Sequence, residues 1–251
     1  MLFTPLEQFQ ILSIFSFKLF CFDFSITNML FVTLIAVLGF FVLTVIASSE
    51  TNTFYIIPNI WQILLESIYD IIGQMLFDNL NTEGEKYFPF VSVLFSFILL
   101  SNLIGLVPYS FTITSHLIVT FSLSLTVFIG INIICIKIYK FKMMSLFIPA
   151  NTSFNLALLL VPIEFVSYIF KPISLGVRLF ANLMAGHTLL KVIVGFSWSM
   201  LLLDDLISIL HIIPLIILVI LMGLELAVAF IQAYVFTILT CIYLNDGINL
   251  H

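Results

Sequence analysis

An all-α polytopic membrane protein is the fold class that this sequence predicts, for three reasons. Hydrophobic residues make up 62% of the 251 residues and charged residues only 8%, which is far from the composition of a soluble domain. Several apolar stretches are long enough to cross a hydrocarbon core of about 30 Å. Polar residues recur at helical spacing in the C-terminal part. We expect one membrane domain over residues 1–251, made of transmembrane helices, an interfacial amphipathic helix and a long, strongly tilted C-terminal helical hairpin.

Composition also excludes several classes of function. The formal net charge is -5, and the densest basic group is Lys137, Lys140 and Lys142, so nucleic acid is not an expected partner. The three cysteines lie far apart without metal-ligand spacing, so we expect no disulfide framework, metal site or cofactor. No Gly-rich nucleotide loop occurs, so no ATP site is expected on this chain.

The N-terminal residues lack both a cleavage site and the Arg-rich pattern of a transit peptide. Together with 28 phenylalanines, this is typical of a chain made inside an organelle with AT-rich DNA and inserted during synthesis. An unusual bacterial protein would have the same composition.

The first two predicted elements differ in character. Residues 26–47 are continuously apolar and long enough to span the membrane. Residues 59–79 instead carry Gln62, Glu66 and Asp70 along one stripe, which predicts an amphipathic helix lying at the interface. Its polar face is acidic, which favours a protein partner over anionic lipid.

Residues 87–136 predict a hairpin of two spans, connected by a short turn at Pro108. The lysines that follow place the next loop on the cytoplasm-like side, which in an organelle is the matrix, because positive residues favour that side. The amphipathic helix and the C-terminus then lie on the matrix side. The N-terminus, the Pro108 turn and a turn at Asp204 and Asp205 face the opposite compartment.

Residues 146–244 predict the long hairpin. Its two arms, 146–200 and 206–244, each exceed the roughly 20 residues that a perpendicular span requires, so they must tilt strongly or break. Four prolines offer kinks: Pro149, Pro162, Pro172 and Pro214.

A charged residue inside an apolar helix marks the first candidate site. Placing Arg178 at mid-membrane costs roughly 2.5 to 3.5 kcal/mol, so it is a functional-site hypothesis, although a snorkelling anchor is an alternative. Glu164 and Lys171 precede Arg178 at intervals of seven and share its helix face, and Asn182 lies close beside them.

A second polar group is predicted on the other side of the same helix. His187 is turned about 180° from Arg178 and should face a neighbouring helix of the same chain. On the last helix, Glu225, Gln232 and Tyr243 form a stripe, and antiparallel pairing could bring Glu225 near His187 and Gln232 near Arg178. A buried histidine and carboxylate can exchange a proton near neutral pH, whereas arginine stays charged.

Several motifs resemble the subunit a family of rotary F-type ATP synthases. The segments SLGVRLFANLMAGH at 174–187 and GLELAVAFIQAYVFTILTCIYLND at 223–246 are similar to the arginine helix and the last helix of that family. Residues 5–9 and 102–116 are similar as well, closest to plant and protist members. The resemblance implies residence in the mitochondrial inner membrane. It also implies that protons, the c-ring, the peripheral stalk, other Fo subunits and a second ATP synthase monomer are partners.

The resemblance also implies roles for individual residues. Arg178 matches the stator arginine, which separates two aqueous half-channels and faces the proton-carrying carboxylate of the c-ring. Asn182 and Gln232 match polar neighbours of that arginine. Many relatives have Arg or Gln where this chain has Lys171, so the electrostatics near the exit half-channel differ here.

The remaining matches concern the two half-channels. His187 and Glu225 match the pair through which protons enter from the intermembrane space, in the mitochondrial arrangement. Glu164 matches the acidic residue of the matrix-side exit, and Tyr243 a polar position near the end of the last helix.

Two other readings of the charged stripe stay open. A self-contained ion-coupled solute transporter would be active as the purified chain alone. A structural scaffold would use the stripe to hold helices together, and Arg178→Gln would then harm assembly rather than conduction. An outward-facing arginine with no partner in its own chain argues against both.

Overall fold

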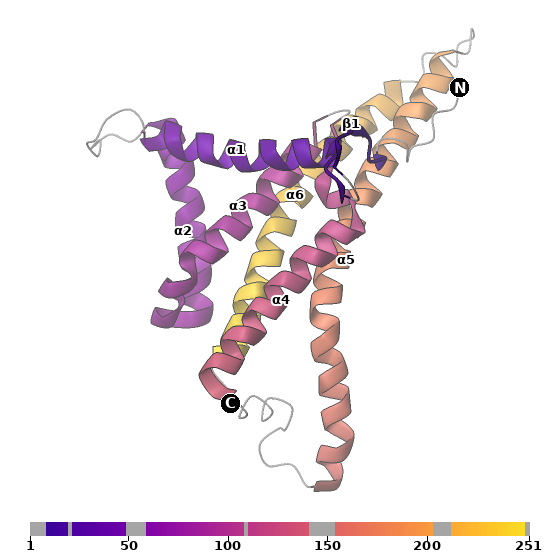
Figure 1. The fold of residues 1–251 in the computed structure, drawn as a ribbon. Coiled ribbons are helices and arrows are strands. Elements are labelled where there is room, and N and C mark those ends of the chain that lie inside the picture. The colour runs from indigo at the N-terminus through magenta and orange to yellow at the C-terminus, as the bar shows by residue number, and fades with distance from the viewer. Residues whose placement is uncertain are drawn as a thin grey trace. The chain divides into compact units, whose positions relative to one another are not determined.

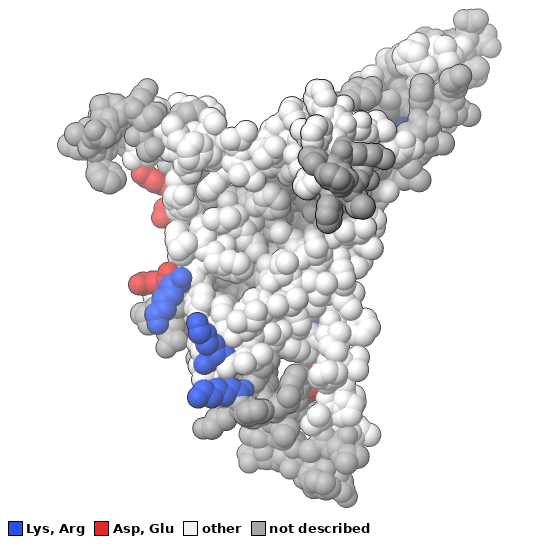
Figure 2. Space-filling model, viewed as in Figure 1, with Lys and Arg blue, Asp and Glu red and all other residues white. Residues whose placement is uncertain are grey.

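Helices dominate the computed structural model, which describes residues 9–19, 22–48, 59–107, 110–140, 154–202 and 212–248. Five helices within these residues are long and apolar enough to cross a membrane, so the predicted all-α polytopic class is confirmed (Figure 1). The face drawn in Figure 2 carries few charged side chains. The helices are α1 (Asn28–Ser48), α2 (Ile60–Leu80), α3 (Phe88–Gly105), α4 (Leu117–Tyr139), α5 (Phe154–Leu201) and α6 (Ile212–Ile248).

Short strands precede α1 and were not expected from the sequence. A segment of two or three residues has no readable period, so sequence patterns rarely reveal such strands. The side chain of Asn28 fixes this segment to the start of α1, because its Oδ1 accepts from the backbone N–H of Leu12 at 3.2 Å and its Nδ2 donates to the Gln10 carbonyl at 3.1 Å. The antiparallel pairs are β1 (Ser13–Phe15) with β4 (Ile26–Thr27), and β2 (Lys18–Leu19) with β3 (Phe22–Asp23).

Helix α2 confirms the helix predicted over 59–79. It begins after Asn59, whose Oδ1 accepts from the backbone N–H of Ile60 at 2.7 Å. On its polar stripe, Gln62 donates to Glu66 at 2.7 Å, one helical turn away. A 3-10 helix at Asn81–Tyr87 connects α2 to α3. The location of α2 at the membrane interface stays a prediction.

Helices α3 and α4 correspond to the hairpin predicted over 87–136. The first ends at Gly105 and the second extends to Tyr139, slightly beyond the predicted boundary. Pro108 lies outside the described residues, but the segment that follows it is described and includes a short 3-10 helix at Ile113–Ser115. Phe111 to Ser115 are buried, which is unusual for a connection between helices.

Helices α5 and α6 have 48 and 37 residues, so both confirm the excess length expected for the C-terminal arms. Pro162 and Pro172 lie inside α5 without ending it. The strong tilt relative to the membrane stays a prediction. The predicted kink at Pro149, the turn at Asp204 and Asp205, and Lys142 lie outside the described residues.

The chain divides into two compact units. The first comprises Met1–Phe54, Ser96–His116 and Leu179–Ala233, and the second comprises Tyr55–Phe95, Leu117–Arg178 and Tyr234–His251. Each unit contains one cluster of polar side chains, and the two clusters are described separately below. A single membrane domain over the whole chain stays a prediction.

Candidate functional site

Glu225 of α6 lies against the backbone of α5 in the first unit. A Cβ placed on Gly186 would be 2.6 Å from Oε1 of Glu225 and 3.2 Å from its Cδ, so the carboxyl group occupies the space that any other residue at position 186 would fill. Glu225 therefore lies beside the residue that precedes His187, as antiparallel pairing of the two helices led us to expect. Glycine at 186 is what permits this approach.

His187 and Glu225 each bury a polar atom that the chain does not satisfy. Within the described residues, Nε2 of His187 and Oε1 of Glu225 have no hydrogen-bond partner. The ring of Phe9 meets the His187 ring edge to face, with centroids 6.4 Å apart and planes at 71°. Buried polar atoms are nearly always hydrogen-bonded, so these two atoms are the places in the first unit where a further polar partner would bind.

A network around Asn102 supports this cluster. Asn102 is fully buried; its Oδ1 accepts from the Thr114 hydroxyl at 3.1 Å and its Nδ2 donates to the Ala229 carbonyl on α6 at 3.4 Å. The network joins α3, α6 and the segment after Pro108 within the first unit. The family motif at 102–116 contains Asn102 and Thr114, but the sequence alone gave no role to either residue.

Gln232 and Asn182 also belong to the first unit. Gln232 is buried on α6, between Ala229 and Ala233, which are buried completely. Asn182 is exposed on α5. The expected approach of both to Arg178, which belongs to the second unit, stays a prediction.

In the second unit, close packing of α5 against α4 determines where Arg178 points. A Cβ on Gly176 would be 2.7 Å from Oγ of Ser124 and 3.0 Å from the carbonyl oxygen of Thr120, so α5 contacts α4 closely at this glycine. Arg178 is two residues later, which is about 200° around the helix, so its side chain points away from α4. It is exposed, and it forms no ion pair or hydrogen bond with other described residues.

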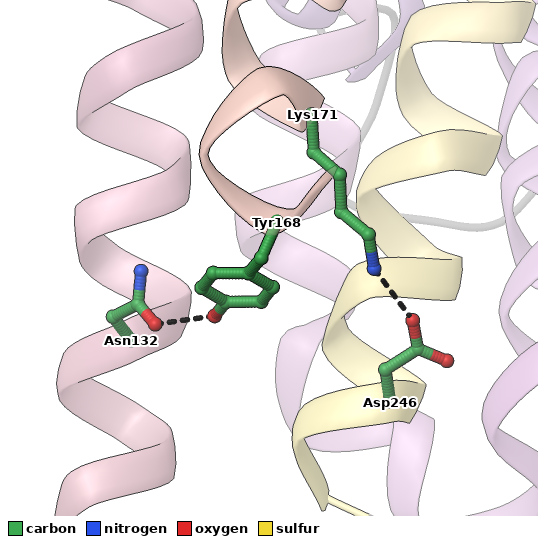
Figure 3. Close-up of polar contacts among 4 residues, drawn as sticks. All are labelled: Asn132, Tyr168, Lys171 and Asp246. Atoms are coloured by element: carbon green, nitrogen blue, oxygen red, sulfur yellow. Dashed lines mark hydrogen bonds and ion pairs between the residues drawn. The ribbon is translucent and has the colours of Figure 1, made fainter. Parts of the chain in front are cut away.

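Lys171 lies in a cluster of polar and aromatic side chains from three helices (Figure 3). Its Nζ donates to Oδ2 of Asp246 at 3.2 Å and lies 4.8 Å from the ring centre of Tyr243 and 5.5 Å from that of Tyr168. The hydroxyl of Tyr168 donates to Oδ1 of Asn132 on α4. Lys171 therefore has an acidic partner within its own chain, whereas Arg178 has none among the residues that the structure describes.

Two further predicted residues lie near this cluster. Glu164 is half-buried on α5, two turns before Lys171. Tyr243 is half-buried on α6 with its ring against the Lys171 ammonium. Sequence reasoning missed Asp246, whose only signal was its position three residues after Tyr243, where the two share a helix face.

Similarity to known proteins identifies the family of this chain. A sequence profile described as ATP synthase A chain matches residues 29–245. This chain belongs to the ATP synthase A chain family. It is 57% identical to ATP synthase subunit a of Pylaiella littoralis over 99% of both chains, and 50% identical to that of Chondrus crispus over 99% of this chain and 97% of the relative. It is 42% identical to ATP synthase subunit a-2 of Arabidopsis thaliana over 99% of this chain and 72% of the relative.

Membership of the family settles the class of function left open by the sequence. The chain is a multi-pass membrane protein that works with other ATP synthase subunits, and the alternative of a self-contained solute transporter is not favoured. The roles of Arg178, Asn182, His187, Glu225, Glu164, Gln232 and Tyr243 stay predictions.

Proposed function

We propose that this chain is the proton-conducting stator subunit of a mitochondrial rotary ATP synthase. The observation that supports this most directly is Arg178, which is exposed on α5 and has no ion-pair partner among the described residues of a chain that belongs to this family. A charge inside a membrane needs a counter-charge. We expect that counter-charge to be the proton-carrying carboxylate of the c-ring.

Protons would enter through Glu225 and His187, whose buried polar atoms lie in the first unit. The pair would protonate a c-ring carboxylate, and the neutral carboxyl could then rotate through the lipid. After nearly a full turn, it would release its proton near Glu164. Arginine cannot titrate near neutral pH, so Arg178 would block a direct path between the two half-channels and make proton flow depend on rotation.

The orientation of the chain follows from its basic residues. Lys137 lies in the last turn of α4 and Lys140 directly follows the helix, and the positive-inside rule places this end in the matrix. With five crossings and α2 at the matrix interface, the C-terminus then also lies in the matrix. The exposed acids Glu66 and Asp70 of α2 would face another subunit of the complex. We propose the peripheral stalk, other Fo subunits and a second monomer as further partners.

Replacing Arg178 tests the proposal. The complex with Arg178→Ala should assemble normally, but membranes that carry it should lose nearly all ATP-driven acidification. Passive proton leak through the same membranes should persist after the soluble head is removed. The control is Lys137→Ala, which removes an exposed charge from the end of α4 and should leave pumping unchanged. Pumping that survives in Arg178→Ala would contradict the stator role, and loss of the assembled complex would favour the scaffold reading.

A further inference from the structure

The segment between α3 and α4 carries one hydroxyl group that differs from its neighbours. Ser110 donates to the Ile104 carbonyl at 2.7 Å, Thr114 donates to Asn102 at 3.1 Å, and Ser115 donates to the Thr112 carbonyl at 2.7 Å. These hydroxyls hold the segment in its fold. The hydroxyl of Thr112 is buried but has no hydrogen-bond partner within the described residues.

Thr112 and His187 both approach Gly105, at the end of α3. The point where a Cβ on Gly105 would lie is 2.9 Å from the methyl carbon Cγ2 of Thr112 and 4.0 Å from Nε2 of His187. Nε2 of His187 and Oε1 of Glu225 are also unpartnered within the described residues. Three buried, unpartnered polar atoms thus belong to the first unit, on side chains that pack around Gly105 and Gly186.

Burial without hydrogen bonds is costly for such atoms. An unsatisfied buried polar group costs about 1 to 3 kcal/mol, so native proteins usually supply a partner, often an ordered water that bonds to about three groups. Side chains around one point are within reach of a short chain of water molecules. Thr112 would be the residue of the α3–α4 segment that binds one of these water molecules.

We propose that the Thr112 hydroxyl holds the water that delivers protons to His187 and Glu225. It would bind this water by hydrogen bonds and remain chemically unchanged, so Thr112 is a positioning residue of the proton path. The inference rests on the proposed function. It adds that the segment between α3 and α4, and not only the long helices α5 and α6, lines the uptake half-channel.

Thr112→Val tests this role, because valine has nearly the shape of threonine but no hydroxyl. ATP-driven acidification per assembled complex should fall roughly five- to tenfold, the factor expected for one lost buried hydrogen bond. Thr112→Ser should restore it. The matched control is Thr114→Val, which removes a hydroxyl that only holds the fold and should reduce the amount of complex, not the activity of each complex.

Water at Thr112 can be tested separately by cysteine labelling. In a background without the three native cysteines, Thr112→Cys should make acidification sensitive to silver ions, because thiolates form and react only where water reaches them. Thr114→Cys, whose position is buried in the hydrogen-bonded fold, should be insensitive. If Thr112→Val prevents assembly, the difference in silver sensitivity between the Thr112→Cys and Thr114→Cys complexes is the test of the inference.

Two outcomes would overturn the inference: undiminished acidification per complex in Thr112→Val, or equal silver sensitivity at positions 112 and 114. Either result leaves the stator role intact as long as Arg178→Ala still abolishes pumping. Surviving activity in Arg178→Ala would instead remove the function on which the inference rests.

Discussion

Two basic residues on one helix face illustrate how environment separates roles. Lys171 is paired with Asp246 and lies near two tyrosine rings, whereas Arg178 has no hydrogen-bond or ion-pair partner among the described residues. The two residues are seven positions apart and therefore share a helix face, so the sequence alone does not distinguish their roles. Only tertiary packing shows that Lys171 is a paired charge and that Arg178 is exposed.

Glycine at position 186 should be necessary for proton uptake. Gly186→Ala places a Cβ 2.6 Å from Oε1 of Glu225, and the flexible glutamate side chain can move away, so we expect normal assembly with a displaced carboxyl group. ATP-driven acidification per complex should fall at least about threefold, because small misplacements of reacting groups cost large factors in rate. Glu225→Ala should give the same phenotype more strongly.

The control for this substitution lies on the same helix. A Cβ on Gly195 would meet no atom within 4 Å, so Gly195→Ala should leave acidification unchanged. Equal activity of both alanine variants would show that the position of the Glu225 carboxyl group does not matter, and intact pumping by Glu225→Ala at neutral pH would remove it from the path.

His116, just before α4, should make stability depend on pH. Burial lowers the pKa of His116 below its ordinary value of 6.5. As pH falls below 6.5, His116 of the unfolded chain binds a proton that His116 of the folded chain does not yet bind, so the free energy of unfolding decreases. At pH values well above 6.5, His116 is neutral in both states and its contribution to stability is constant. Thermal unfolding of the purified complex between about pH 7.5 and pH 5.5 should show a larger loss for the wild type than for His116→Gln. Equal losses would contradict this.

At the scale of elements, sequence patterns predicted every long helix but not what lies between them. Continuous apolar runs revealed α1, α3, α4, α5 and α6, and the acidic stripe revealed α2. The N-terminal strands were missed because each is too short to have a period. The buried segment after Pro108 was noticed as a motif, but the hydrogen bond from Thr114 to Asn102 and the approach of Thr112 to Gly105 could not be read from the sequence.

Close packing of α5 on α4 should depend on Gly176. In Gly176→Ala, the new Cβ would lie 2.7 Å from Oγ of Ser124 and 3.0 Å from the Thr120 carbonyl oxygen, and a backbone atom cannot move aside easily. Overpacking of this kind costs roughly 1 to 3 kcal/mol, so the melting temperature and the yield of the assembled complex should both decrease.

Gly130→Ala on α4 is the matched control, because a Cβ there would meet no atom within 4 Å. Alanine in place of a helical glycine otherwise stabilises by roughly 0.5 to 1 kcal/mol, so this variant should be at least as stable as the wild type. A stable Gly176→Ala complex would show that the two helices have room to separate.

At the scale of the whole molecule, burial is distributed unevenly among the spanning helices. Within the described residues, 56% of the spanning window of α3 is buried, but only 11% of that of α5 or α6. Among the spanning helices other than α1, whose window is 6% buried, the two that carry Arg178, His187 and Glu225 are therefore the ones that the chain itself covers least. Lipid and other subunits must complete their surroundings, and the composition alone could not show which helices these would be.

The isolated chain should consequently be inactive. Reconstituted alone into vesicles, it should take up neither protons nor small solutes in response to a membrane potential, because in the proposed function the carboxylate that carries the proton belongs to the c-ring. Adding the c-ring should produce proton uptake, measured with a trapped pH dye, and Arg178→Ala should uncouple that flux from rotation. Uptake by the chain alone would support a self-contained transporter, because such a protein encloses its whole pathway within one polypeptide.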